Sequence, residues 1–298
     1  MLLRYGEFGS ALAAAACWGR IEIVQFLVQK GNADVNMLLQ YGRYGNALVA
    51  AAYWGRIEIV KFLVQEGKAD VNMQLQYGEY GSALAAATCS WRIEIVKFLA
   101  QEGKADVNGQ NGSALAVAAR SWRIEIVKFL VQKGKADVNM LLQYGEFGSA
   151  LATACSGEIE IDKFLIQEGK PDMNMLLQYG KYSSALAAAA CSGDIEIAKF
   201  LVQRGADVNL LLHSGEYGSA LVAAAYWGQI RCAEYLIDAG AKVNLKLENG
   251  PYDTALRAAQ TDVPQPFLWW DMRSEERLKQ EKAEVTELLQ RHGARNDD

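Results

Sequence analysis

The chain repeats one short pattern eight times, and this repetition restricts its fold more than any other feature of the sequence. Each copy contains an Ala-Leu pair that opens an alanine-rich run. The pairs begin at Ala11, Ala47, Ala83, Ala114, Ala150, Ala185, Ala220 and Ala255, so that successive copies are 36, 36, 31, 36, 35, 35 and 35 residues apart. Periods of about 20–50 residues are typical of solenoids. We therefore expect one repeat domain over residues 1–298, with copies starting near residues 9, 45, 81, 112, 148, 183, 218 and 253.

A single copy, residues 46–72, predicts two helices joined by a tight turn. Asn46 is a helix N-cap candidate, and the small residues that follow it have strong helix propensity. Gly55 is placed to end this first helix, and residues 57–65 carry the apolar stripe of a second one. The N-cap candidates of the other copies are Ser10, Ser82, Ser113, Ser149, Ser184, Ser219 and Thr254. The pattern therefore predicts an all-α repeat solenoid of helix-turn-helix units, each followed by an extended hairpin loop.

The composite pattern GSALAAAAYWGRIEIVKFLVQ-GADVN resembles the ankyrin repeat, over the whole chain and in register in all eight copies. One departure is that Ser/Asn-Ala-Leu-Ala/Val replaces the family's Thr-Pro-Leu-His, so the Thr–His hydrogen bond of that family is absent. The copies look like the ankyrin arrays of filamentous fungi, which often form the sensor ends of larger proteins. The resemblance implies that the hairpins and the first helices line a concave binding groove.

Aromatic residues occupy many positions that the resemblance assigns to the groove. The two positions before the inter-helix glycine read Tyr53-Trp54 in copy two and Tyr226-Trp227 in copy seven. Binding hot spots are enriched in Trp, Tyr and Arg. The predicted binding residues are Trp18, Tyr44, Tyr53, Trp54, Tyr80, Arg120, Tyr144, Tyr226 and Trp227. For the hairpin tyrosines the alternative is packing against neighbouring hairpins, because they recur so regularly.

The hairpins are also long and apolar, as in Met37-Leu38-Leu39. An exposed apolar stripe is a liability, so we expect these residues either to be packed or to form an interface. The hairpin tips alternate in charge, which predicts ion pairs between neighbouring hairpins. These tip residues are Glu7, Arg43 and Glu79, and then Glu146, Lys181 and Glu216.

Three copies depart from the pattern. In copy four the hairpin is five residues shorter, at residues 108–112, and Arg120 is the one cationic residue among the groove positions. We hypothesise that this notch admits an anionic group of a partner to Arg120; the alternative is a solvated side chain. In copy five, Asp162 stands where other copies have Val, and we favour a locally rotated helix over a polar pocket. Trp91 and Trp122 replace the inter-helix glycine, which predicts a different turn geometry in copies three and four.

The two ends of the array differ. Residue 1 already lies within a repeat and no polar cap precedes it. We expect either that the array is the carboxy-terminal part of a longer protein or that it associates end to end. Residues 261–298 contain an insertion and a long charged helix, from about Ser274 to Gln290, which we expect to cap the last repeat. Phe267, Trp269 and Trp270 of the insertion are expected to cover its apolar face; the alternative is a lid over one end of the groove.

Composition and motifs favour a binding protein over an enzyme. The net charge of −5 does not favour binding to the phosphate backbone of nucleic acid, and no apolar run approaches the length of a membrane span. The sequence contains no recognisable nucleophile–base pair, metal cluster or phosphate loop. We therefore expect a non-catalytic protein- or peptide-binding scaffold without a cofactor, forming the recognition array of a larger intracellular protein. We expect it in the cytoplasm, with the nucleus left open.

The alternative function is a small-molecule site or an unconventional enzyme in the notch of copies three to five. Its residues would be Arg120, Cys89, Cys155 and Asp162.

Overall fold

Helices arranged in antiparallel pairs make up the fold. The structure of the chain is a computed structural model, and it describes residues 8–75, 79–109, 113–142, 148–155, 159–247, 251–262 and 274–295. These described residues form sixteen helices and no strand. The first helices of the repeats are α1 (Ala11–Cys17), α3 (Ala47–Tyr53), α5 (Ala83–Cys89), α7 (Ala114–Arg120), α9 (Ala150–Ala154), α11 (Ala185–Ser192), α13 (Ala220–Tyr226) and α15 (Ala255–Gln260). The second helices are α2 (Ile21–Gln29), α4 (Ile57–Gln65), α6 (Ile93–Gln101), α8 (Ile124–Gln132), α10 (Ile159–Glu168), α12 (Ile195–Gln203), α14 (Ile230–Asp238) and α16 (Glu275–Arg291).

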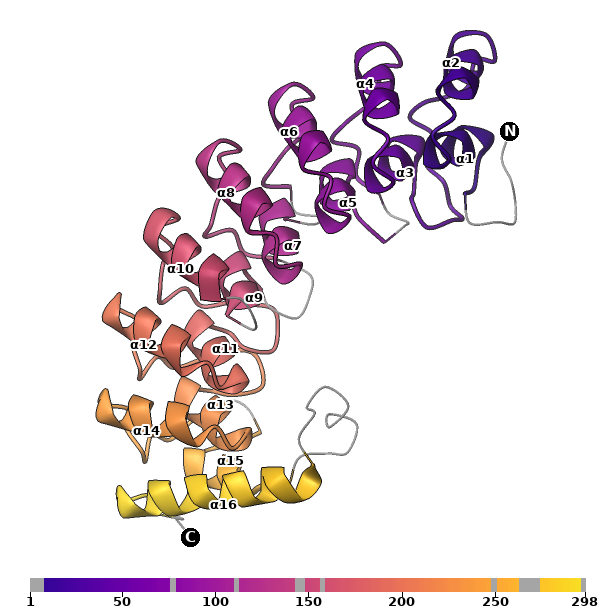
Figure 1. Cartoon of the computed structure of the whole chain (residues 1–298). Coiled ribbons are helices and arrows are strands. Elements are labelled where there is room, and N and C mark those ends of the chain that lie inside the picture. The colour runs from indigo at the N-terminus through magenta and orange to yellow at the C-terminus, as the bar shows by residue number, and fades with distance from the viewer. Residues whose placement is uncertain are drawn as a thin grey trace. The chain divides into compact units, whose positions relative to one another are not determined.

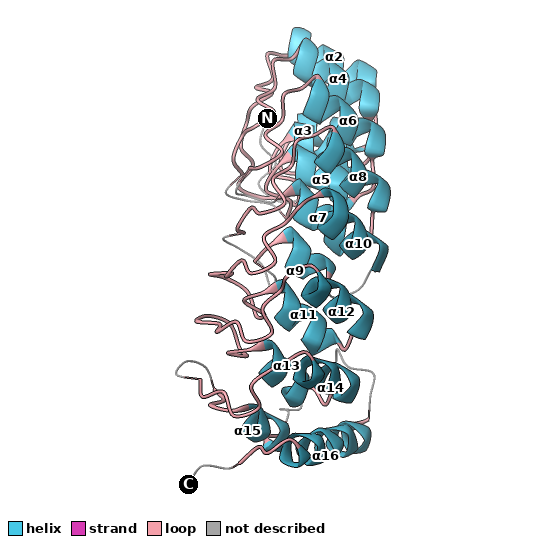
Figure 2. Cartoon of the chain, turned by 90° about the vertical axis from the view of Figure 1, so that its left-hand side faces the viewer, coloured by secondary structure: helices cyan, strands magenta, loops and turns pink. Residues whose placement is uncertain are grey.

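The helices group into two compact units, Met1–Asp137 and Val138–Asp298. Within the first unit, helices α1, α3, α5 and α7 form one row and α2, α4, α6 and α8 form another (Figure 1). The second unit repeats this arrangement with α9 to α16. Figure 2 shows the loops between repeats on the side of the first helices in each unit. An all-α repeat solenoid is therefore confirmed as the fold class, while the single domain over 1–298 stays a prediction.

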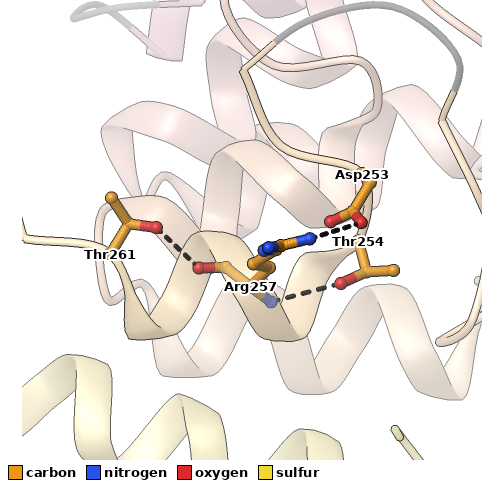
Figure 3. A network of polar contacts seen from close by, with 4 residues as sticks. All are labelled: Asp253, Thr254, Arg257 and Thr261. Atoms are coloured by element: carbon orange, nitrogen blue, oxygen red, sulfur yellow. Dashed lines mark hydrogen bonds and ion pairs between the residues drawn. The ribbon is translucent and has the colours of Figure 1, made fainter. Parts of the chain in front are cut away.

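Side-chain capping starts every first helix, as the sequence predicted. Ser10, Asn46, Ser82, Ser113, Ser149, Ser184, Ser219 and Thr254 each accept a hydrogen bond from the backbone N–H three residues later. Figure 3 shows the eighth copy, where the Thr254 hydroxyl accepts from the Arg257 N–H at 3.2 Å. The Arg257 guanidinium pairs with the Asp253 carboxylate at 2.9 Å, and the Thr261 hydroxyl donates to the Arg257 carbonyl. Short alanine-rich helices have little stability of their own, so these caps define where each one begins.

The turn between the two helices keeps one geometry whether or not it contains glycine. Gly19 and Gly55 have φ of 73° and 74° in the first two copies. Trp91 and Trp122 stand at the same place with φ of 64° and 57°, so the prediction of a different turn geometry was wrong. A bulky residue in this left-handed region costs on the order of 1–3 kcal/mol. The packing of the two helices therefore imposes the turn on whatever residue occupies it.

A ladder of asparagine side chains joins successive repeats. The Asn72 amide donates to the Lys104 carbonyl at 3.1 Å, and its oxygen accepts from the Asp106 N–H at 2.7 Å. The same two bonds are made by Asn36, Asn108, Asn174, Asn209 and Asn244. Each asparagine thus spans the gap between its own repeat and the next one within its unit, and it pairs backbone groups of the loop that follows the next repeat's second helix.

Asp162 lies inside the second unit rather than on a rotated helix. It is fully buried on the face of α10 that also buries Ile161 and Leu165. The equivalent Val60 and Val127 are buried on the same face of α4 and α8, so the expected rotation was wrong. The Cys155 thiol lies beside the carboxyl, and burial, together with the charge of Asp162, raises the pKa of this thiol. The helix keeps its register because Leu165 and the other apolar residues anchor it.

The last helix is a second helix extended at its N-terminal end. The predicted charged helix is confirmed as α16, with Ser274 as its N-cap and Gly293 at φ 86° after its end. Lys282 is buried, and its ammonium donates to the carbonyls of Tyr226 and Ala258 at 2.7 and 3.2 Å. Burial lowers the pKa of Lys282 to about 8. The aromatic residues Phe267, Trp269 and Trp270 lie outside the described residues.

The ladder predicts that Asn72→Ala will destabilise the first unit. Two hydrogen bonds between repeats are lost, and each contributes roughly 0.5–1.5 kcal/mol, so we expect a loss of about 1–3 kcal/mol in the free energy of unfolding. Urea denaturation followed by circular dichroism measures it. Gln65→Ala, an exposed change in the same repeat, serves as the control and should have little effect. Equal stabilities for Asn72→Ala and the parent would contradict the role of the ladder.

The burial of Asp162 predicts that Asp162→Val stabilises the second unit. A valine fills this position in α4 and α8, and removing a buried carboxyl avoids its desolvation, so we expect a gain of about 1–3 kcal/mol. The midpoint of chemical denaturation measures the gain. Val127→Asp is the reciprocal control and should destabilise the first unit. A midpoint that falls in Asp162→Val would show instead that the carboxyl supports the fold.

Candidate binding surface

The hairpin aromatics of the first unit form one stacked row. The ring of Tyr44 lies between those of Phe8 and Tyr80, at 6.5 and 6.4 Å between centroids and within 15° of parallel. These residues come from three successive hairpins, so the row crosses three repeats. The alternative that hairpin tyrosines pack on their neighbours therefore describes Tyr44, which is buried with 4% of its surface exposed.

The aromatic pair of copy two is attached to this row. The Trp54 indole N–H donates to the Tyr44 hydroxyl at 2.7 Å, and the rings of Tyr53 and Tyr80 lie 4.8 Å apart. Tyr53 comes from the last turn of α3, and Trp54 is the C-cap of that helix. The hydrogen bond holds one edge of the Trp54 ring while 40% of the residue stays exposed. An exposed indole in a fixed orientation loses less conformational entropy when it binds.

The second unit repeats this cluster. The Trp227 indole N–H donates to the Tyr217 hydroxyl at 2.7 Å, and the ring of Tyr226 packs on that of Tyr252 at 5.0 Å. The Lys282 ammonium lies 4.5 Å from the centroid of the Tyr226 ring. Because α16 covers this side, Tyr226 is buried and Trp227 is only half-exposed. Burial raises the pKa of Tyr226 and Tyr217, so both hydroxyls remain protonated donors and acceptors.

Arg43 contacts the aromatic residues of the first unit and pairs with a glutamate of the next hairpin. The Arg43 guanidinium lies 5.4 Å from the Tyr53 ring centroid, and it pairs with the Glu79 carboxylate at 2.7 Å. The hydrogen bond to Arg43 lowers the pKa of Glu79. The predicted ion pair between these two hairpin tips is confirmed, and the Lys181 and Glu216 tips are joined by a backbone hydrogen bond of 2.9 Å. Glu7 and Glu146 lie outside the described residues.

The predicted binding residues differ in how much surface they offer. Trp18 and Arg120 are exposed, with 64% of Trp18 accessible, while Tyr53 and Tyr80 are half-buried. Tyr44 and Tyr226 are buried, so they position their tryptophan neighbours and offer little surface of their own. Tyr144 lies outside the described residues. A binding role for these residues stays a prediction.

The apolar hairpin runs divide into packed and exposed positions. Leu39, Leu177 and Leu212 are buried, with at most 4% of their surface exposed. The residues just before them, Leu38, Leu176 and Leu211, are 42–45% exposed. Alternate residues of each run therefore point inward and outward, so packing is confirmed for the buried leucines, and an interface at the exposed ones stays a prediction.

The notch predicted for copies three to five has one exposed residue, Arg120, and two buried ones, Cys155 and Asp162. Arg120 ends α7 and is exposed to solvent. Cys155 and Asp162 are fully buried against each other, so neither is open to a small molecule. Residues 110–112 of the short hairpin lie outside the described residues. Nothing among the described residues therefore favours the small-molecule alternative.

Comparison with known protein families finds the family described as ankyrin repeats (3 copies), matched over residues 4–75, 48–141 and 149–247. The chain belongs to the ankyrin repeat family. Ankyrin repeats are protein-interaction scaffolds in general, and the family is typically without enzymatic activity. A comparison with curated proteins finds no match. Within the part of the chain that the structure describes, no helix has both the length and the apolar character that a membrane crossing requires.

Two features of this ankyrin surface were missed from the sequence. Arg43 was assigned only to an ion pair, although its guanidinium also covers the ring of Tyr53. Lys282 was treated as part of a charged helix, although it reaches the carbonyl of Tyr226. Aligning Gly293 with the glycine that follows the other second helices places Lys282 at the position of Arg92, and this alignment would have revealed its role.

Proposed function

We propose that the chain is a non-catalytic protein- or peptide-binding scaffold, acting in the cytoplasm as the recognition array of a larger protein. The observation that carries this proposal is the Trp54 ring, held by the Tyr44 hydroxyl while 40% of the residue faces solvent. Trp18 lies one repeat earlier with its ring 6.3 Å from Phe8 of the same row. Fixed, exposed indoles on a rigid surface are what hot spots of protein interfaces use.

The second unit offers a weaker version of the same surface. Trp227 has the same hydrogen bond as Trp54 but is less exposed, because α16 and Lys282 lie against its neighbour Tyr226. We therefore place the principal binding surface of this ankyrin array in the first unit. The surface consists of Trp18, Tyr53, Trp54 and Tyr80.

Selection of binders from a random-peptide library tests the proposal. A selected peptide should bind the Trp54→Ser variant at least about tenfold more weakly than the parent in calorimetric titration. Serine is a matched replacement because Ser90, Ser121 and Ser192 occupy this position in other copies. Tyr44→Phe should give a smaller loss, since it keeps the ring and removes only the hydrogen bond to Trp54.

The control for this titration is Trp227→Ser, which makes the same change in the second unit and should leave most of the affinity in place. Failure to select any peptide, or affinities that do not depend on Trp54, would contradict the proposal. Circular dichroism of each variant separates a loss of binding from a loss of folding.

For the first repeat we propose, as the alternative to coverage by another part of a larger protein, association with a second copy of the chain. Ile23 and Phe26 on α2 are 51% and 64% exposed, whereas the equivalent Ile59 and Phe62 on α4 are 2% and 5% exposed. An apolar face that is covered in one repeat and open in another favours association.

Sedimentation velocity measures this association. The parent should form reversible dimers as its concentration rises, and Phe26→Lys should remain monomeric, because it places a charge on the apolar face. Gln29→Lys adds the same charge at an exposed position of the same helix and should still dimerise. A parent that stays monomeric at every concentration would exclude the contact.

A further inference from the structure

Four tryptophans stand at the same turn in the four repeats of the first unit. Trp18 and Trp54 are the C-caps of α1 and α3, and Trp91 and Trp122 lie in the turns after α5 and α7. They are exposed by 64%, 40%, 59% and 60%. The chain has seven tryptophans, so more than half of them are exposed at one edge of one unit.

Arginines alternate with these tryptophans along the edge. Arg20, Arg56, Arg92 and Arg123 directly precede the second helices α2, α4, α6 and α8. The Arg56 Nε donates to the Cys17 carbonyl at 3.0 Å, which places its guanidinium against the turn of Trp18. The Arg123 Cζ lies 3.4 Å from the centroid of the Trp91 ring. We call these four tryptophans and four arginines the Trp–Arg edge.

The guanidinium groups of the edge are not neutralised within the described part of the first unit. No described carboxylate lies within ion-pair distance of Arg56, Arg92 or Arg123. The nearby glutamates pair instead with lysines of their own helices, as Glu58 does with Lys61 at 3.7 Å. Residues 1–137 contain 15 Lys and Arg against 12 Asp and Glu, while residues 138–298 contain 15 against 23. The positive charge of the edge therefore remains available to a partner.

The fold does not require this edge. In the second unit the same turns are Ser192-Gly193-Asp194 and Trp227-Gly228-Gln229. Gln229 takes the place of the arginine and donates to the Cys191 carbonyl at 3.1 Å, so an uncharged side chain suffices for the contact between repeats. Glycine likewise avoids the strain that Trp91 and Trp122 bear at positive φ. Exposed rings held at an energetic cost, where glycine would serve, indicate a role in binding.

From this arrangement we infer that the Trp–Arg edge binds an extended polypeptide segment in which acidic residues alternate with large apolar ones. Helical repeats stack at roughly 10 Å, and an extended chain advances about 3.3 Å per residue, so every third residue of such a segment meets one tryptophan. Each guanidinium between two tryptophans donates paired hydrogen bonds to a carboxylate of the segment. The inference rests on the proposed function and adds to it the chemistry of the partner.

The test uses the full chain and a fluorescein-labelled twelve-residue peptide of four Phe-Glu-Ser units, with anisotropy as the readout. The parent should bind this peptide, and binding should weaken as salt rises. The Arg56→Gln/Arg92→Gln double variant copies Gln229 and should bind at least about tenfold more weakly. Trp91→Gly/Trp122→Gly copies the turns of other repeats and should show a similar loss.

The controls isolate the edge from net charge and from folding. Lys61→Gln/Lys97→Gln removes the same two charges from α4 and α6 outside the edge and should change the affinity less than about twofold. The same peptide with Lys in place of Glu should not bind. Thermal unfolding shows that each variant is folded.

Three outcomes would overturn the inference. These are equal losses in the edge and control variants, equal binding of the Lys peptide, and tighter binding of a single-stranded oligouridine, which would assign the edge to nucleic acid. If peptides selected from the library still depend on Trp54 in any of these cases, the proposed function stands and only the inference about the edge fails. If no peptide of either kind binds, both fail.

Discussion

The asparagine ladder is the interaction on which the stacking of the repeats depends. A two-helix repeat buries its apolar face only against its neighbours, so the repeats must be held at a fixed spacing. Asn72 and its counterparts set that spacing by bonding a carbonyl and an N–H of the next repeat. In each case the carbonyl belongs to a residue with left-handed backbone, for example Lys104 in the first unit and Gly205 in the second. The strain at the lysines is one cost of that spacing.

Sequence reasoning predicted the helices well because their signals are local. The eight N-caps, the helix pairs and α16 follow from capping residues, helix propensity and glycine. The failures at Asp162 and Trp122 share a cause: the sequence shows that a residue is unfavourable at its position, but not that its neighbours outweigh it. Leu165 and Ile161 keep α10 in register although Asp162 is buried with them. Apolar contacts along a whole helix contribute more than one unfavourable side chain removes.

The candidate site could be predicted only in part. The sequence identified the aromatic positions, but it did not distinguish rings that face solvent from rings that hold others in place. Tyr44 and Trp54 were treated alike, yet the first is buried and orients the second. The distinction depends on how three hairpins stack, and this is a contact between residues about 36 positions apart. For Trp91 and Trp122 the sequence predicts only an unfavourable backbone conformation, and it does not indicate that both rings are exposed on the surface.

The way in which α16 joins the second unit has a consequence for the length of the array. Lys282 donates to the carbonyl of Tyr226, the last residue of the first helix in the repeat before it, as Arg92 does to the carbonyl of Tyr53 in the first unit. Asn244 in turn donates to the carbonyl of Gly293, just after α16. The long helix α16 thus uses the same contacts between repeats as the shorter second helices. Whole repeats can be gained or lost ahead of α16 without a new kind of contact having to evolve, so arrays of different lengths can share this helix while their binding surfaces diverge.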